Sequence, residues 1–163
     1  MNFRNADISD LPIIVDIYNS TIESRMVTAD TSPVTVAEKE NWFYEHNPDT
    51  RPLWIIEDEN KHIIGWVSFQ DFYGRPAYNG TAEISIYLAE EARGKGYGKE
   101  ILDYCIKKSP SLKINTLLGF IFSHNAPSIK LFLDAGFKEW ANLEEIAEMD
   151  EKKYSLKILG RKI

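Results

Sequence analysis

Six consecutive residues, Arg93-Gly94-Lys95-Gly96-Tyr97-Gly98, have the composition of a phosphate-binding turn. Glycines at alternate positions let the backbone approach a ligand closely and direct successive N–H groups into one concavity. A helix that begins behind the turn adds a partial positive charge, and Arg93 and Lys95 add two full ones. These residues therefore predict a site that binds phosphate mostly through main-chain atoms.

Two well-known phosphate-binding motifs do not fit this turn. The dinucleotide fingerprint G-x-G-x-x-G needs glycine at the sixth position, which is Lys99 counted from Gly94 and Ile101 counted from Gly96. The P-loop needs Ser or Thr after its lysine, and here Glu100 follows Lys99. The residues match R-x-x-G-x-G after an apolar strand. Taken alone, the turn is equally well interpreted as a tight strand-to-helix connection.

The strand before the turn is predicted over 81–88 by its alternation. Its two faces carry Ala82, Ile84, Ile86 and Leu88 on one side, and Thr81, Glu83, Ser85 and Tyr87 on the other. The helix behind the turn is expected to point Ile101, Leu102 and Cys105 inward and to end near Ser109.

The remaining pattern predicts a mixed α/β chain with several hairpins. Further strands are expected at 3–6, 53–57, 62–72, 114–122, 137–145 and 154–159. Further helices are expected from Asp7 or Ser9 to Ile22, from the capping box Thr35–Glu38 to near Asn47, and from the cap Asn125 to Gly136. The fold class is α/β of the α+β type: a mixed, mostly antiparallel sheet of about six or seven strands, flanked by about four helices.

Length and composition are those of one domain, residues 1–163, with 44% hydrophobic and 27% charged residues. A net charge of −6 argues against nucleic-acid binding. The single Cys105 and the scattered His46, His62 and His124 suggest no metal site. No apolar run reaches the ~20 residues of a membrane span, and Met1 opens no signal peptide, so a cytoplasmic location is expected.

The strand and turn resemble the pyrophosphate-binding motif of the GNAT N-acetyltransferase superfamily, whose cofactor is acetyl-CoA. The helix that starts at Asn125 and ends in Gly136-Phe137 is similar to a second superfamily element. Four segments resemble more narrowly the phosphinothricin acetyltransferase group: 17–23, 75–78, 81–87 and 158–162. The resemblance implies a single GNAT domain that acetylates the α-amino group of small amino acids or analogues such as phosphinothricin or methionine sulfoximine, and a homodimer.

Glu83 is the candidate general base of this reaction. An amine must be neutral to attack a thioester, and an α-amino group with a pKa near about 8 is mostly protonated at pH 7. In the resembling family the glutamate of the matching T-x-E-x-S motif is proposed for this role. A strand-surface glutamate in a salt bridge is the alternative interpretation.

The resemblance implies a cofactor site along the strand and the turn. The backbone of Ile86, Tyr87 and Leu88 would bind the pantetheine arm. One N–H there could donate a hydrogen bond to the oxyanion that forms from the thioester carbonyl. The pyrophosphate would lie on Arg93, Gly94, Lys95, Gly96, Tyr97 and Gly98. Asn125 would combine a helix cap with a cofactor contact, and Ser128 would join it.

One position departs from the family pattern. Many superfamily members carry a tyrosine four residues before the glycine that ends this helix, where it can protonate the departing thiolate, and the phosphinothricin group often has histidine. Here the residue is Phe132, which has no proton to give. Solvent, Tyr87 or Tyr97 could supply the proton, and the acid stays unassigned.

The acceptor site is expected in the loop before the strand. Arg75 could hold a substrate carboxylate through a bidentate pair, although a solvated loop arginine is an equal alternative. Tyr73, Gly74 and Tyr78 would complete the site with Glu83, and Asn19, Glu23 and Phe72 are weaker candidates.

Two further functions stay open. One is acetylation of a protein or peptide amine. The other is a non-catalytic CoA-binding or regulatory domain, which the missing tyrosine allows; Glu83 and Arg75 together argue against it, because a pure binder needs neither.

Overall fold

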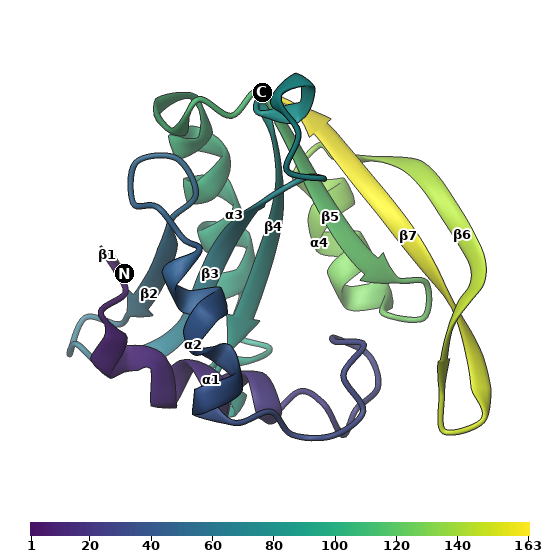
Figure 1. The fold of residues 1–163 in the computed structure, drawn as a ribbon, viewed down its shortest axis with the longest axis horizontal. Helices are drawn as coiled ribbons and strands as arrows, with labels where there is room; N and C mark the ends of the chain where they lie inside the picture. The colour runs from purple at the N-terminus through teal and green to yellow at the C-terminus, as the bar shows by residue number, and fades with distance from the viewer.

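The computed structural model describes residues 1–163 and contains one seven-stranded sheet with helices on both faces (Figure 1). The strands are β1 (Asn2–Asn5), β2 (Leu53–Glu57), β3 (Ile63–Asp71), β4 (Thr81–Leu88), β5 (Thr116–Phe122), β6 (Lys138–Met149) and β7 (Lys152–Lys162). Their order is β1-β2-β3-β4-β5-β7-β6, and every neighbouring pair is antiparallel except β4 and β5. The predicted mixed, mostly antiparallel sheet is confirmed.

Four α-helices cover the sheet, as predicted (Figure 1). They are α1 (Leu11–Asn19) and α2 (Val36–Tyr44) on one face, and α3 (Tyr97–Lys108) and α4 (Ala126–Asp134) on the other. The apolar sides of the helices close one core with the sheet, and Ile101, Leu102 and Cys105 of α3 are fully buried in it. None of the helices has the length and apolar composition that crossing a membrane requires.

The helix starts follow the predicted caps, and the first helix ends early. The reciprocal capping box of Thr35 and Glu38 is present, with the Glu38 N–H donating to Thr35 Oγ1 over 3.2 Å. Asp7 caps a short 3₁₀ turn (Ile8–Asp10) that leads into α1. Helix α1 ends at Asn19 rather than at Ile22. The hydroxyls of Ser20 and Thr21 donate back to main-chain carbonyls there, which competes with continued helix.

Strands β4 and β5 are joined at one end only. Their parallel register covers three positions, Thr81–Thr116, Ala82–Leu117 and Glu83–Leu118. Beyond Glu83 the two strands diverge, while β4 continues along β3 to Leu88 and β5 continues along β7 to Phe122. The sheet therefore opens into a wedge in which the inner edge of β4 has no strand partner from 84 to 88, and its main-chain groups are free except for the Leu88 carbonyl, which accepts from Arg93 Nε.

The last two strands are longer than predicted and form one hairpin. They were expected at 137–145 and 154–159, but they extend over Lys138–Met149 and Lys152–Lys162. Two register shifts interrupt their pairing, between Glu139 and Ala141 and between Leu143 and Ala147. A bulge interrupts the alternation of inward and outward side chains, so the sequence pattern does not show that the strand continues beyond it.

Candidate active site

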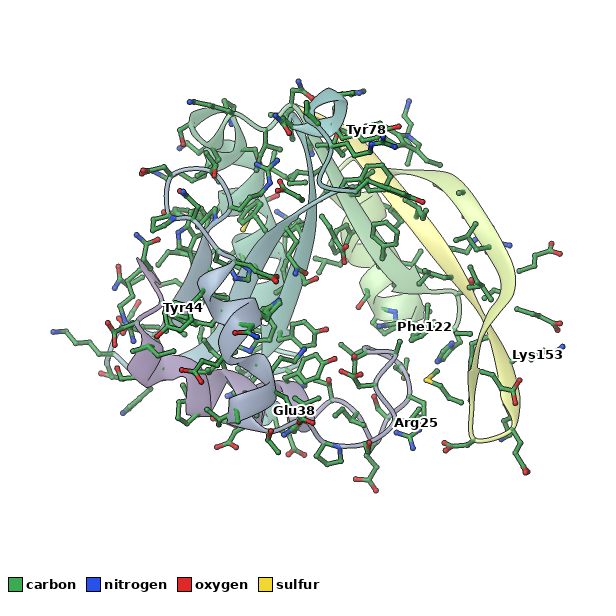
Figure 2. The ribbon with its side chains drawn as sticks, in the orientation of Figure 1. Arg25, Glu38, Tyr44, Tyr78, Phe122 and Lys153 are labelled. Atoms are coloured by element: carbon green, nitrogen blue, oxygen red, sulfur yellow. The ribbon has the colours of Figure 1, made fainter.

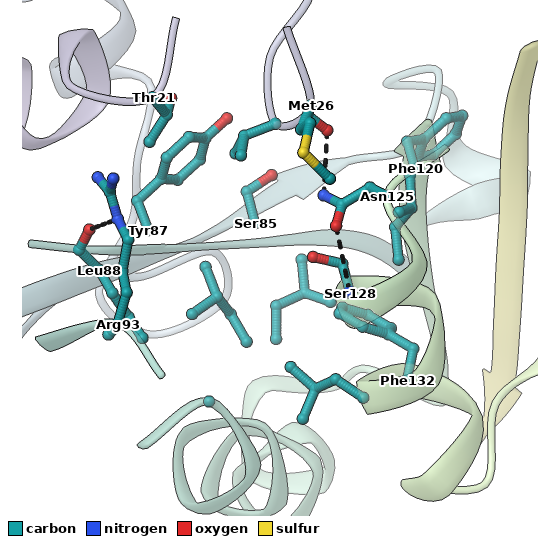
Figure 3. Close-up of a pocket in the computed structure, with 16 residues that line it drawn as sticks. Thr21, Met26, Ser85, Tyr87, Leu88, Arg93, Phe120, Asn125, Ser128 and Phe132 are labelled. Atoms are coloured by element: carbon teal, nitrogen blue, oxygen red, sulfur yellow. Dashed lines mark hydrogen bonds between the residues drawn. The ribbon is translucent and has the colours of Figure 1, made fainter. Parts of the chain in front are cut away.

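The wedge between β4 and β5 contains a pocket of about 210 Å³ (Figure 3), called the wedge pocket below. Its wall comes from β4, β5, α4, the start of α3 and the segment after α1. The predicted cofactor residues that line it are Ile86, Tyr87, Leu88, Arg93, Gly98, Asn125 and Ser128. The structure thus brings together residues that lie up to 42 positions apart in the sequence (86 to 128).

The glycine turn adopts the conformation that its composition suggests. Gly94 and Gly96 have φ of +72° and +84°, the left-handed region that side chains other than glycine rarely adopt, and Gly96 is the residue at the N-terminus of α3. A Cβ at either position would have nothing within 4 Å, so the backbone conformation alone demands glycine. Residues 93–96 of the turn are exposed, and the turn stands at the positive end of helix α3.

The cations of the turn are in different states. Arg93 donates through Nε to the Leu88 carbonyl over 3.0 Å and through Nη2 to the Ser20 hydroxyl (Figure 3). Lys99 is paired with Asp103 at 2.9 Å. Lys95 is exposed and makes neither a hydrogen bond nor an ion pair, whereas Arg93 is bound only to neutral acceptors. Tyr97 opens α3 beside the wedge pocket without lining it.

Asn125 uses both ends of its side-chain amide. Oδ1 accepts from the Ser128 N–H over 3.2 Å, which is the predicted cap, and Nδ2 donates to the Met26 carbonyl over 3.0 Å (Figure 3). His124 binds the carbonyl of the neighbouring Arg25 at 2.7 Å. The segment after α1 is therefore held across the open end of the wedge by the start of α4.

Phe132 fills the position at which the family pattern has a proton donor. Its ring is buried and packs against β5 at Gly119, where a Cβ would lie 2.5 Å from Cε1 of the ring. Ser128 precedes it by one helical turn on the same side of α4, and both line the wedge pocket (Figure 3). Of the two tyrosines considered as the acid, only Tyr87 lines this pocket.

A second pocket of about 170 Å³ lies on the other face of the sheet under α1 and α2, and is called the helix pocket below. Its floor consists of three cross-strand pairs of β3 and β4, Trp66–Tyr87, Ser68–Ser85 and Gln70–Glu83. Its roof consists of Ile14, Val15 and Tyr18 of α1 and Lys39 and Trp42 of α2. Ser85 and Tyr87 line both pockets, so the two meet at β4.

Glu83 lies half-buried in the helix pocket without a hydrogen-bond or ion-pair partner among the protein's side chains. Burial raises the pKa of its carboxyl above the usual range. A carboxylate with a raised pKa accepts a proton more readily than an exposed one. The salt bridge that a structural role would require is absent.

The aromatic side chains beside Glu83 keep their hydroxyl protons at neutral pH. Tyr87 stacks on Trp66 with centroids 4.3 Å apart, and burial raises the pKa of its phenol. Burial and the hydrogen bond to Asp30 raise the pKa of Tyr18 to about 12. Both phenols therefore stay protonated, but the hydroxyl of Tyr18 already donates to Asp30.

The loop that was predicted to bind the acceptor lies elsewhere. Tyr73, Gly74, Arg75 and Tyr78 are exposed and line neither pocket. The loop includes a short 3₁₀ turn (Pro76–Tyr78) and precedes β4 at the closed end of the wedge; Figure 2 shows Tyr78 at the opposite end of the sheet from Phe122. Asn19 instead bonds both main-chain polar groups of Val34 at 2.9 Å.

Sequence reasoning missed the roof of the helix pocket and part of its floor. No local pattern marks Tyr18, Lys39 or Trp42 as site residues. One signal was available for the floor: Ser68 and Gln70 place polar groups at a period of two within an otherwise buried strand.

Comparison with known proteins defines the class. Residues 14–137 match the model of the Acetyltransferase (GNAT) family. A Bacillus subtilis protein that carries the provisional name phosphinothricin acetyltransferase is 54% identical over all of this chain and 99% of its own. The L-methionine sulfoximine/L-methionine sulfone acetyltransferase of Pseudomonas aeruginosa is 27% identical over 90% of this chain and 86% of its own.

Comparison with solved structures gives the same class of protein. A crystal structure provisionally described as a phosphinothricin N-acetyltransferase superposes with a TM-score of 0.95 at 54% identity, covering 99% of this chain and 97% of that one. The phosphinothricin acetyltransferase of Sinorhizobium meliloti in complex with acetyl-CoA superposes with a TM-score of 0.91 at 26% identity, over 99% and 88%. The fold is that of an acetyltransferase. The chain belongs to the GNAT family.

Proposed function

We propose that this protein transfers the acetyl group of acetyl-CoA to the amino group of a small amino acid or analogue, with Glu83 as general base. The names of the relatives support the reaction class, and the acetyl-CoA complex of the Sinorhizobium protein supports the cosubstrate. The observation that carries the proposal is the position of Glu83: an unpaired, desolvated carboxyl in a small pocket that meets the wedge pocket at Ser85 and Tyr87.

The wedge pocket suits the cosubstrate. The free main-chain groups of 84–88 would pair with the amides of the pantetheine arm as a further strand would. The turn 93–98 would hold the pyrophosphate on its N–H groups, and Lys95 would neutralise part of its charge. Asn125 retains one amide hydrogen for a contact to the arm, since only one goes to Met26.

Acetyl-CoA supplies the acetyl thioester, whose C–S bond breaks as the amine nitrogen forms its bond to the carbonyl carbon. Glu83 takes the proton that the ammonium must lose, directly or through a water. A main-chain N–H of 84–88 donates to the carbonyl oxygen as negative charge develops there, which is worth about 2.7–4 kcal/mol in other oxyanion holes. Tyr87 gives its phenol proton to the departing sulfur, and the second proton that the acylated nitrogen must lose returns to the phenolate through water.

The size of the helix pocket restricts the acceptor. Its 170 Å³ is small beside the roughly 300–1,000 Å³ of sites for drug-sized ligands. A panel of L-amino acids, phosphinothricin, L-methionine sulfone and simple amines, assayed for acetyl-CoA-dependent thiol release, tests the proposal. Turnover of amino-acid-like amines is the expected result, and tight CoA binding without turnover of any amine would contradict it.

A second candidate is the acetylation of a protein N-terminus. A ribosomal-protein-alanine N-acetyltransferase structure from Brucella melitensis superposes with a TM-score of 0.91 at 26% identity over the whole of both chains. An alanine-initiated peptide added to the panel distinguishes the two candidates. Homodimerisation, a cytoplasmic location and an acceptor role for Tyr73, Gly74, Arg75 and Tyr78 stay predictions; gel filtration with light scattering tests the first.

A further inference from the structure

Lys39 is the only cationic side chain in the wall of the helix pocket. It projects from α2, and its Nζ lies 4.9 Å from the ring centroid of Tyr18 and 5.6 Å from that of Trp42. These two aromatic faces line the same pocket and hold the half-buried ammonium in place by cation–π attraction.

The ammonium of Lys39 has no anionic partner within 4.0 Å and no hydrogen-bond acceptor among the protein's atoms. Other helix lysines are paired, such as Lys99 with Asp103 and Lys130 with Asp134, each one turn along its own helix. Of its two acidic neighbours in the sequence, Glu38 is engaged in the capping box with Thr35, and Glu40 forms no ion pair with it. Lys39 therefore carries an uncompensated charge into the pocket.

The opposite charge in the same pocket, on Glu83, is also without a partner. Glu83 belongs to the floor and Lys39 to the roof, and they form no ion pair with each other. A pocket with one free carboxylate and one free ammonium on opposite walls complements a ligand that carries one cation and one anion. An amino acid is such a ligand, whereas a simple amine is not.

We propose that Lys39 binds the carboxylate of the acceptor and makes the enzyme selective for amines that carry a carboxylate. The inference rests on the proposed function and names the group that determines its substrate class. Glu83 then faces the amino group and Lys39 the carboxylate. Arg75, the sequence-based candidate for this contact, lies outside the pocket.

The test compares one acceptor in two forms, L-methionine sulfone and its carboxamide, which differ only in the negative charge. The wild type is expected to prefer the acid. Lys39→Met keeps the unbranched side chain over Tyr18 and Trp42 but removes the charge. This variant is expected to lower the acid-to-amide ratio of kcat/KM at least about tenfold, which corresponds to about 1.4 kcal/mol. The change should arise mainly from a higher KM for the acid, and kcat/KM for the amide should stay the same. Lys39→Arg is expected to retain the preference.

Lys61→Met, an exposed lysine in the turn between β2 and β3, is the matched control. Binding gives a second readout, because Trp42 and Trp66 line the pocket and their fluorescence reports acceptor binding without turnover. If no amine is acetylated, the proposed function fails, and the fluorescence titration of acid against amide still decides the role of Lys39. An unchanged acid-to-amide ratio in Lys39→Met, or a collapse in Arg75→Met instead, overturns the inference. The inference is also overturned if the wild type shows no preference for the acid over the amide in either kcat/KM or the fluorescence titration.

Discussion

Glu83 of β4 stands opposite Leu118 of β5 at the last register position that joins these two parallel strands. From this point the strands part, and the wedge pocket opens on one side of β4 while the helix pocket lies over its other face. The residue proposed as the base is therefore placed where the two pockets approach each other, and the main chain that follows it supplies the free groups for the cosubstrate.

Replacing Glu83 by Gln should leave the free energy of unfolding at pH 7 unchanged or raise it. The folded-state pKa of Glu83 is raised, so its favourable contribution is complete below the unfolded value of about 4.3 and is lost as the pH rises through the folded-state pKa. Burial without a partner disfavours the ionised form of the carboxyl, so the carboxylate costs stability once the group ionises. Urea unfolding of both proteins at pH 4 and pH 7 measures the effect. A clear destabilisation at pH 7 would indicate a structural contact instead.

Arg4→Met should destabilise the fold by about 1–2 kcal/mol at pH 7. This lies between the free energy lost with an exposed salt bridge and that lost with a buried one. Arg4 donates to Asp10 at 2.7 and 2.9 Å and to Glu57 at 2.7 Å, joining β1, the start of α1 and β2. These bonds hold the pKa of both carboxyls below the usual range. The stability they contribute is present above about pH 4 and is lost as the pH falls through the folded-state values.

The check for Arg4 is the difference in unfolding free energy between wild type and variant at pH 7 and at pH 2.5. This difference should shrink in acid. An equal difference at both values would show that the Arg4 side chain stabilises by packing alone.

Gly96→Ala should weaken CoA binding, because alanine disfavours the φ of +84° that directs the turn's N–H groups. Gly74→Ala is the matched control: it has φ of +57°, also has nothing within 4 Å of a Cβ, and lies outside both pockets. Each substitution should cost about 1 kcal/mol of stability. Calorimetric titration with CoA should show a loss of affinity in the Gly96 variant only. Equal affinities in the two variants would remove the turn from the cosubstrate site.

Tyr87→Phe should lower kcat about tenfold or more while leaving the affinity for CoA unchanged, because the stacking on Trp66 is kept and only the proton is removed. Tyr97→Phe serves as the control, since Tyr97 does not line the wedge pocket. Turnover of Tyr87→Phe at the wild-type rate would show that solvent protonates the leaving thiolate.

The cofactor half of the site could be predicted because its signals are local. The alternation of 81–88, the glycine turn and the cap at Asn125 each depend on neighbours within one strand or one helical turn. Strand β4 has the predicted bounds, and Asn125 caps α4 as predicted.

The acceptor half could not be predicted in the same way. Tyr18 and Lys39 reach the helix pocket only because α1 and α2 pack over β3 and β4, which is a tertiary arrangement without a local signature. Arg75 seemed close because it precedes β4 in the sequence. The strand then leads away from that loop by about 3.3 Å per residue, so the loop stays at the closed end of the wedge.

In the proposed mechanism Glu83 accepts the proton of the attacking amine. It is tested by kcat/KM of Glu83→Gln for L-methionine sulfone between pH 6 and pH 10, with Glu59→Gln, exposed in the turn between β2 and β3, as the control. We expect kcat/KM to fall about 10²–10⁴-fold at pH 7, with a smaller fall above the pKa of the amine and no fall in the control. A Glu83→Gln enzyme with the wild-type rate and pH profile would contradict it.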